Sequence, residues 1–186
     1  RAVDVPLAST FVLSAKAGKE AFVQPEFSDG DYRFVIRTGK SNDVERTKLG
    51  TSAGKRQGFK CLMSDVPMAY PYVRAEAKAG RMGARLMAVV AEGVRGRVYI
   101  SPTEESETVT RNLAPSWRPN SEMPKKHRNF QPPVYGMDNL GDIFSDRQLV
   151  ALNTLSELIS EVGSEVGNEE YGTALTAYLS FALDKG

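Results

Sequence analysis

Short runs of β-branched and aromatic residues alternate with turn-forming residues through the first part of the chain. Three runs cover residues 7–14, 21–27 and 32–38, and the turn signals Lys-Ala-Gly-Lys and Ser-Asp-Gly-Asp separate them. This spacing predicts the strands of a small antiparallel sheet. Two further runs, at residues 86–91 and 98–101, flank a glycine-bearing turn and predict a second hairpin.

Two polar segments lie beside these strands. Residues 39–58 contain four glycines and follow neither the helical nor the strand period, so they predict a long, mobile loop. Thr103, followed by Glu104 and Glu105, predicts the start of a short helix. A threonine side chain can cap the first backbone N–H groups, and carboxylates favour the positive end of the helix dipole.

The C-terminal part carries two helical patterns. The first begins with a capping box, Ser145 with Gln148, and ends before Gly163, and the second begins at Asn168 as N-cap. The apolar stripe predicted for the first helix is Leu149, Leu152, Leu155, Ile159 and Val162, and that for the second is Tyr171, Leu175, Tyr178, Leu179 and Ala182. Two such helices pack on each other, or they leave one stripe for a further partner.

Five prolines at residues 114–136 separate these regions and predict an extended linker. The sequence therefore predicts an α+β fold. A small antiparallel β-rich module with one short helix occupies residues 1–113, a proline-rich connection occupies 114–137, and two C-terminal amphipathic helices occupy 138–186.

The net charge of +1 hides a strong asymmetry. Residues 1–128 hold 22 Lys/Arg against 14 Asp/Glu, whereas residues 129–186 hold 2 against 9. A basic half suits a polyanion, but the opposite halves can equally pair with each other or with further domains. The chain opens on Arg1 rather than methionine, so we expect it to be a piece of a larger protein.

Apolar runs are far shorter than the roughly 20 residues that cross a bilayer, so we expect no membrane partner. The single cysteine, Cys61, excludes an internal disulfide framework and predicts a cytoplasmic location. No glycine-rich phosphate loop, His-Glu-x-x-His or Gly-x-Ser-x-Gly motif occurs. His127 lies in a basic cluster without an orienting partner, and we expect no catalytic residue and no enzyme activity.

A cation-rich segment at residues 72–85 alternates basic with small residues and contains two glycines. Its side chains can meet a phosphate backbone, or the segment can be a turn followed by a solvated strand edge. The predicted DNA-binding residues are Lys78, Arg81, Arg85, Arg95 and Arg97.

Residues 72–83, 88–93, 95–99, 134–137 and 142–149 together resemble the middle region of a family of adenine-specific DNA methylases. These are large proteins with an N-terminal domain of unknown function, and the most specific segment is Phe-Ser-Asp-Arg-Gln-Leu at 144–149. The resemblance implies an inserted, non-catalytic region of an S-adenosylmethionine-dependent parent. The cofactor and adenine motifs of such methylases are absent from this sequence. The nearest segment to the adenine motif, Gln-Pro-Pro-Val-Tyr at 131–135, has glutamine in place of Asn or Asp and a valine inserted before the tyrosine. We therefore expect S-adenosylmethionine for the parent and no cofactor in this chain.

Relatives in that family resemble zinc-ribbon proteins in this region, with two Cys-x-x-Cys pairs. Here Cys61 is followed by Ser64, and the first pair is absent, so the resemblance implies a degenerate ribbon without metal. The leading hypothesis is a fragment that assists weak, non-specific DNA binding or target recognition. The alternative is a structural insertion that braces the catalytic domain or mediates protein–protein contacts. In either case the remaining domains of the parent are expected partners.

Overall fold

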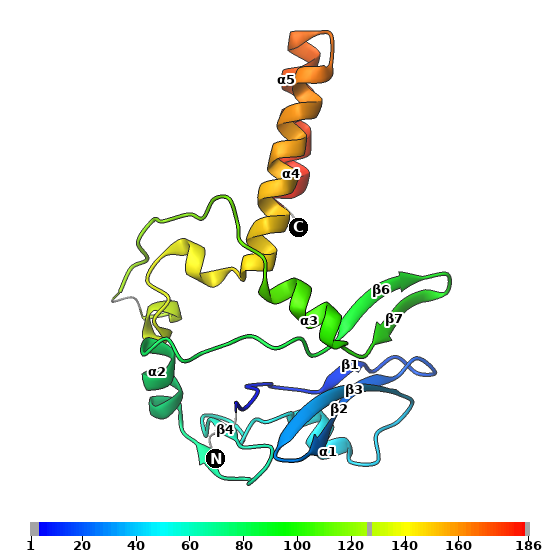
Figure 1. Cartoon of the computed structure of the whole chain (residues 1–186), viewed down its shortest axis with the longest axis vertical. Coiled ribbons are helices and arrows are strands. Elements are labelled where there is room, and N and C mark those ends of the chain that lie inside the picture. The colour runs from blue at the N-terminus through cyan, green and yellow to red at the C-terminus, as the bar shows by residue number, and fades with distance from the viewer. Residues whose placement is uncertain (1–3, 126–127, 185–186) are drawn as a thin grey trace. The chain divides into compact units, whose positions relative to one another are not determined.

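The computed structural model describes residues 4–125 and 128–184 and confirms the predicted α+β class (Figure 1). The chain forms two compact units. The first contains the residues up to Thr108 together with Val134–Gly136, and the second contains Val109–Pro133 and the residues from Met137 onward.

The first unit is built on a three-stranded antiparallel sheet. Its strands are β1 (Val12–Ser14), β2 (Ala21–Ser28) and β3 (Asp31–Thr38), in the order β1-β2-β3. The strands predicted at 21–27 and 32–38 are confirmed, whereas the one predicted at 7–14 is limited to its last three residues. Asp29 and Gly30 both have positive φ, 47° and 80°, as a two-residue hairpin turn requires. One face of the sheet forms the core, which comprises Phe11, Val23, Tyr32, Phe34 and Leu62.

Residues 39–58 are more ordered than the predicted loop. They contain a helix, α1 (Val44–Leu49), whose first turn is capped by the Asp43 side chain. The segment is also hydrogen-bonded to the chain before β1, since Phe11 N donates to Thr47 O at 2.8 Å and Ala8 N to Thr51 Oγ1 at 2.9 Å. These bonds satisfy buried polar groups, so a segment with few apolar residues still packs on the sheet.

The cation-rich segment, residues 72–85, begins inside a helix. Neither the phosphate-contact interpretation nor that of a turn with a strand edge predicts this helix. Two short strands, β4 (Phe59–Lys60) and β5 (Pro67–Met68), precede α2 (Tyr70–Lys78). The helix ends at Lys78, and Gly80 follows with a φ of 70°; Gly80 N donates to Ala77 O and Arg81 N to Glu76 O. This is a Schellman motif, so Gly80 serves as a helix stop.

The predicted second hairpin is confirmed as β6 (Val89–Gly93) and β7 (Gly96–Ile100). Beyond its base, Ser101 Oγ accepts a hydrogen bond from Ile36 N at 2.9 Å, which ties the hairpin to β3. Helix α3 (Glu104–Arg111) follows, and Thr103 Oγ1 accepts from Ser106 N at 3.2 Å, so the predicted cap is confirmed.

In the second unit, α4 (Asp146–Glu165) and α5 (Glu169–Leu183) form a helical hairpin. The Ser145–Gln148 capping box and the Asn168 cap are both present as predicted. The predicted stop at Gly163 is wrong, because α4 continues through it. A Cβ at Gly172 would lie 2.3 Å from Gly163 O, so these glycines let the helices approach closely.

The packed face of α5 differs from the predicted stripe. Tyr171 and Tyr178 are exposed, whereas Gly172 is buried and Leu179 is half-buried. Small residues at the contact bring the two backbones together, and the large aromatic side chains of α5 are left outside it.

The proline-rich residues pack along the start of α4. Met123 is buried, and its N–H donates to Asp138 O at 2.8 Å. Arg118 forms an ion pair with Asp146, and the Asn153 amide donates to Trp117 O at 2.9 Å. Residues 132–135 and 140–143 form the short 3-10 helices η1 (Pro132–Tyr135) and η2 (Leu140–Ile143).

Over the described ranges 4–125 and 128–184, no helix combines the length and apolar character needed to cross a membrane.

Candidate nucleic-acid interface

Two of the predicted DNA-binding cations lie at the end of α2. Lys78 is exposed in the last helical turn, and Arg81 follows the Gly80 stop. Arg81 forms a two-pronged contact with Glu76, with Nε at 2.6 Å from Oε2 and Nη2 at 2.8 Å from Oε1. Hydrogen bonding from Arg81 lowers the pKa of Glu76. The charge of Arg81 is therefore already matched by a carboxylate one helical turn away.

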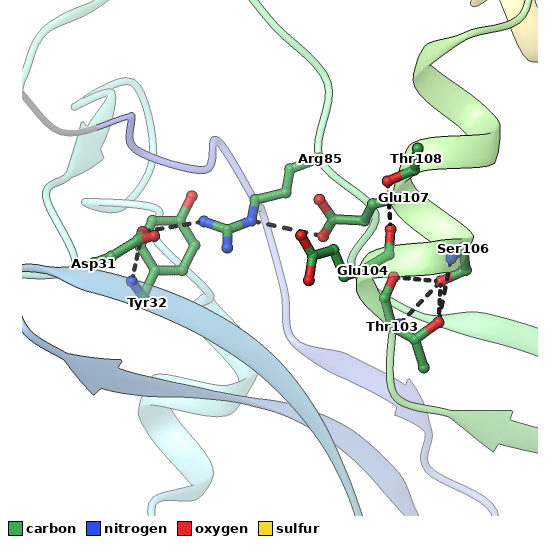
Figure 2. Close-up of polar contacts among 8 residues, drawn as sticks. All are labelled: Asp31, Tyr32, Arg85, Thr103, Glu104, Ser106, Glu107 and Thr108. Atoms are coloured by element: carbon green, nitrogen blue, oxygen red, sulfur yellow. Dashed lines mark hydrogen bonds and ion pairs between the residues drawn. The ribbon is translucent and has the colours of Figure 1, made fainter.

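Arg85 lies against the aromatic edge of the sheet (Figure 2). Its guanidinium carbon is 4.4 Å from the ring centroid of Tyr32 and 5.9 Å from that of Phe34. Nη1 is 3.4 Å from Asp31 Oδ1, and Nε is 3.8 Å from Glu107 Oε1. Only 30% of the Arg85 side chain is exposed. Arg85 therefore links β3 to the first turn of α3, and it offers little free charge.

The pKa of the neighbouring Tyr32 hydroxyl is shifted by the same surroundings. Burial raises the pKa of Tyr32, and the Arg85 guanidinium partly offsets that rise by hydrogen bonding to the phenol. A neutral phenol beside a cation held by two carboxylates is a structural arrangement rather than an acid–base pair.

Arg95 and Arg97 lie on the β6–β7 hairpin, in the turn and in β7, and both are exposed. Val94, next to them in the turn, is 106% exposed. The strand register places Arg97 opposite Glu92. Within the described part of the chain, however, no ion pair holds the side chain of either arginine.

A third cation joins this hairpin from the β1–β2 turn. Lys19 Nζ donates to Arg95 O at 2.5 Å, so its positive charge lies at the hairpin tip. Sequence reasoning missed Lys19, although its turn sequence, Lys-Ala-Gly-Lys, was the available signal. We call Lys19, Arg95 and Arg97 the hairpin cations.

The structure thus divides the five predicted residues into two sets. Arg81 and Arg85 have carboxylate partners, whereas Lys78, Arg95 and Arg97 have no ion pair among the described residues. The hairpin cations are brought together, and Lys78 lies on a different element. His127 lies outside the described residues.

Cys61 lies in the turn between β4 and β5. A hydrogen bond from Ser64 is the main cause that lowers the pKa of the Cys61 thiol, against an opposing effect of burial. Within residues 4–125 and 128–184, no group of three or more His, Cys, Asp or Glu side chains is placed to hold a metal ion. The thiol is therefore a single polarised group in a turn.

A hollow of about 440 Å³ lies between β2 and residues 40–47. Its polar lining is used by the start of α1, since Ser41 Oγ is 2.7 Å from Thr47 Oγ1 and Thr47 Oγ1 donates to Asp43 O at 2.8 Å. Those bonds tie the Ser41 and Thr47 hydroxyl groups to the start of α1.

No known protein family, curated protein or solved structure matches this chain. The resemblance to adenine-specific DNA methylases stays a prediction based on the segments quoted from the sequence.

Proposed function

We propose that this chain is a non-catalytic part of a larger, cytoplasmic adenine-specific DNA methyltransferase, and that it binds DNA weakly with little sequence preference. The observation that carries the proposal is the β6–β7 hairpin with its three cations. Arg95 and Arg97 are exposed and have no ion pair in the described residues, so their charges are available to phosphate groups.

The hairpin also has a suitable shape for duplex DNA. A two-stranded antiparallel ribbon fits the major groove, and Lys/Arg side chains along its edges reach the flanking phosphates. The bond from Lys19 to the carbonyl of Arg95 fixes the turn in place. Three cations support few phosphate contacts, so we expect weak binding with a clear dependence on salt.

The resemblance supplies the methyltransferase part of this proposal. It implies S-adenosylmethionine for the parent protein, and it implies that the remaining domains of the parent are partners of this chain. Neither methylase motif occurs in the sequence, so no residue here is assigned to the cofactor.

Fluorescence anisotropy of a short labelled duplex, titrated with the chain at several salt concentrations, tests the DNA-binding proposal. Each neutralised phosphate contributes about −0.9 to the slope of log affinity against log salt. Replacing Arg95 and Arg97 with alanine should therefore flatten the slope by about 1.8 units if each arginine meets one phosphate.

The matched control is Arg33→Ala with Arg37→Ala. It removes the same charge from unit 1, but from arginines that already bond to Glu26 at 2.8 and 2.6 Å. We expect this control to retain most of the slope. Absence of binding at low salt, or equal flattening by both double variants, would count against the hairpin as the DNA-binding element.

A further inference from the structure

The helical hairpin of the second unit leaves large apolar side chains uncovered. Six of them have between 39% and 77% of their surface exposed: Leu155, Leu158, Val162, Tyr171, Tyr178 and Phe181. Buried hydrophobic residues of this unit are Met123 and Leu149. The exposed apolar set is thus larger than the buried one, and scattered single residues do not explain it.

The exposed residues of each helix follow a regular row. Those of α4 are spaced by three and four residues, and those of α5 by seven and three, as on one side of an α-helix. Leu158 and Val162 come directly before Ile159 and Gly163, which are half-buried in the hairpin. Since one residue corresponds to about 100° around a helix, this row lies beside the packed face of α4.

The same offset occurs in α5. Tyr171 and Tyr178 come directly before Gly172 and Leu179 on its packed face. The contact of Gly163 with Gly172 joins the end of α4 to the start of α5, so the helices are antiparallel (Figure 1). In antiparallel helices that face each other, the same rotational offset turns both rows to one side. The two rows therefore form one face, which we call the hairpin apolar face, and Phe181 lies at its outer edge on α5.

The charge around this face is strongly negative. Residues 146–184 contain seven Asp/Glu and one cation, Arg147. Two copies of the hairpin would bring like charges together, whereas a cationic partner would be attracted. Two parallel apolar rows with three- and four-residue spacing also present the groove that a further helix fills in a bundle.

We propose that the hairpin apolar face binds an amphipathic helix with Lys/Arg flanks from another polypeptide, completing a three-helix bundle. Leucine or similar side chains of that helix pack between the two rows, with Tyr171 and Tyr178 as the large anchors and Phe181 at the edge. Glu161 and Glu165 of α4 and Glu170 of α5 supply the negative charge that selects a basic partner. This inference concerns the second unit and is independent of the DNA-binding proposal for β6–β7.

The test uses the whole chain and two synthetic helical peptides. Both carry leucine at the a and d positions of a heptad repeat, and their remaining positions are mainly lysine in one and mainly glutamate in the other. Calorimetry should show saturable binding of the lysine peptide, and the glutamate peptide should bind at least about tenfold more weakly. Affinity for the lysine peptide should fall as salt is added.

The variant Tyr178→Ser with Phe181→Ser should weaken binding of the lysine peptide by about tenfold or more. The matched control, Thr173→Ala with Ser180→Ala, alters exposed polar residues of the same helix and should bind like the unchanged chain. Circular dichroism checks that both variants keep their helices. Three results would overturn the proposal: no peptide binding, equal binding of both peptides, or a dimer of the chain that the Tyr178/Phe181 variant dissociates.

Discussion

Arg85 shows how partners distant in sequence decide what a charged side chain does. The sequence places it among basic and small residues, which is a pattern suited to phosphate contact. The structure places its guanidinium over Tyr32 and near Asp31, 54 residues earlier in the chain. No local pattern contains that information, so the sequence predicts the charge of Arg85 but not its surroundings.

We predict that Arg85→Ala destabilises the first unit by about 1 kcal/mol, mainly through loss of the cation–π contact and of packing by the side-chain stem. The pair with Asp31 adds little, since Asp31 is 70% exposed and solvent screens it, and the contact with the less exposed Glu107 is long, at 3.8 Å. Arg85→Lys keeps the charge but loses the planar contact with the ring. Its free energy of unfolding should therefore lie between those of the unchanged chain and Arg85→Ala. Urea unfolding followed by a fluorophore on Cys61 measures the change.

Arg81→Ala is the control for this prediction, because its pair with Glu76 lies on the surface. We expect it to change the free energy of unfolding by less than about 0.5 kcal/mol. An equal loss in both variants would mean that removal of positive charge, rather than the contact with Tyr32, sets the stability.

The Cys61 thiol gives a second prediction at the residue scale. Because hydrogen bonding from Ser64 lowers the pKa of the thiol, Ser64→Ala should raise that pKa toward its ordinary value. The thiolate fraction at a fixed pH below the ordinary value should then fall. The pH dependence of the reaction rate with a disulfide reagent reports the shift. Cys61 and Ser52 line a second hollow, beside the end of α1. Ser52→Ala alters that hollow without touching the Ser64 hydrogen bond, so it should leave the profile in place.

At the scale of elements, local signals were sufficient where an element is defined by its own neighbours. The starts of α4 and α5 depend on hydrogen bonds between residues three apart in sequence, so the caps at Ser145 and Asn168 are predictable from sequence. The packed face of α5 depends on which residues of α4 lie opposite. Hydrophobicity alone predicts that Tyr171 and Tyr178 lie on the packed face. The close approach of the two backbones requires a small residue there instead, which is Gly172.

The helix α1 and the grouping of the hairpin cations also depend on contacts between segments that are distant in sequence. Six residues are too few for a stable isolated helix. Helix α1 is supported because Thr47 O accepts a hydrogen bond from Phe11 N, and Thr51 N, just after the helix, donates to Ala8 O. The β6–β7 hairpin itself was predictable from its turn. The position of Lys19 at its tip required the three-dimensional arrangement of two separate turns.

We predict that Gly172→Ala destabilises the helical hairpin, although alanine is normally favoured over glycine in a helix by about 1 kcal/mol. The added Cβ would lie 2.3 Å from Gly163 O, a backbone atom that cannot move without separating the helices. Overpacking of this kind costs about 1–3 kcal/mol, which exceeds the gain in helix propensity. Hydrogen exchange of the α4 and α5 amides should therefore become faster.

Gly167→Ala is the matched control, because a Cβ at Gly167 meets nothing within 4 Å. It should leave exchange nearly unchanged. Slower exchange in Gly172→Ala would show that the helices separate at little cost and that propensity dominates.

At the scale of the whole molecule, the charge asymmetry is smaller between the compact units than along the sequence. The first unit contains 17 Lys/Arg and 13 Asp/Glu, and the second contains 7 and 10. Cations of the proline-rich residues belong to the second unit, where Arg118 pairs with Asp146 and Lys125 with Asp138. Part of the basic half therefore neutralises the acidic half, and the positive charge available to DNA is concentrated on fewer residues.

The two units also differ in how much apolar surface they bury. The first contains seven of the buried hydrophobic residues, and the second contains Met123 and Leu149. Since apolar burial is the main favourable term in folding, we predict that the second unit unfolds at lower denaturant than the first. Two unique residues report on them separately, because Trp117, the single tryptophan, lies in the second unit and Cys61, the single cysteine, lies in the first.

Urea unfolding should therefore give two curves that do not coincide. Tryptophan emission should change at a midpoint about 1 M below that of a fluorophore on Cys61, which corresponds to a difference of about 1–2 kcal/mol for units of this size. Asn153→Ala removes the amide that donates to Trp117 O, so it should shift the tryptophan curve alone. Arg85→Ala should shift the Cys61 curve alone. If both reporters give one common transition, and each variant moves both curves together, the chain folds as a single cooperative body and the division into two units is wrong.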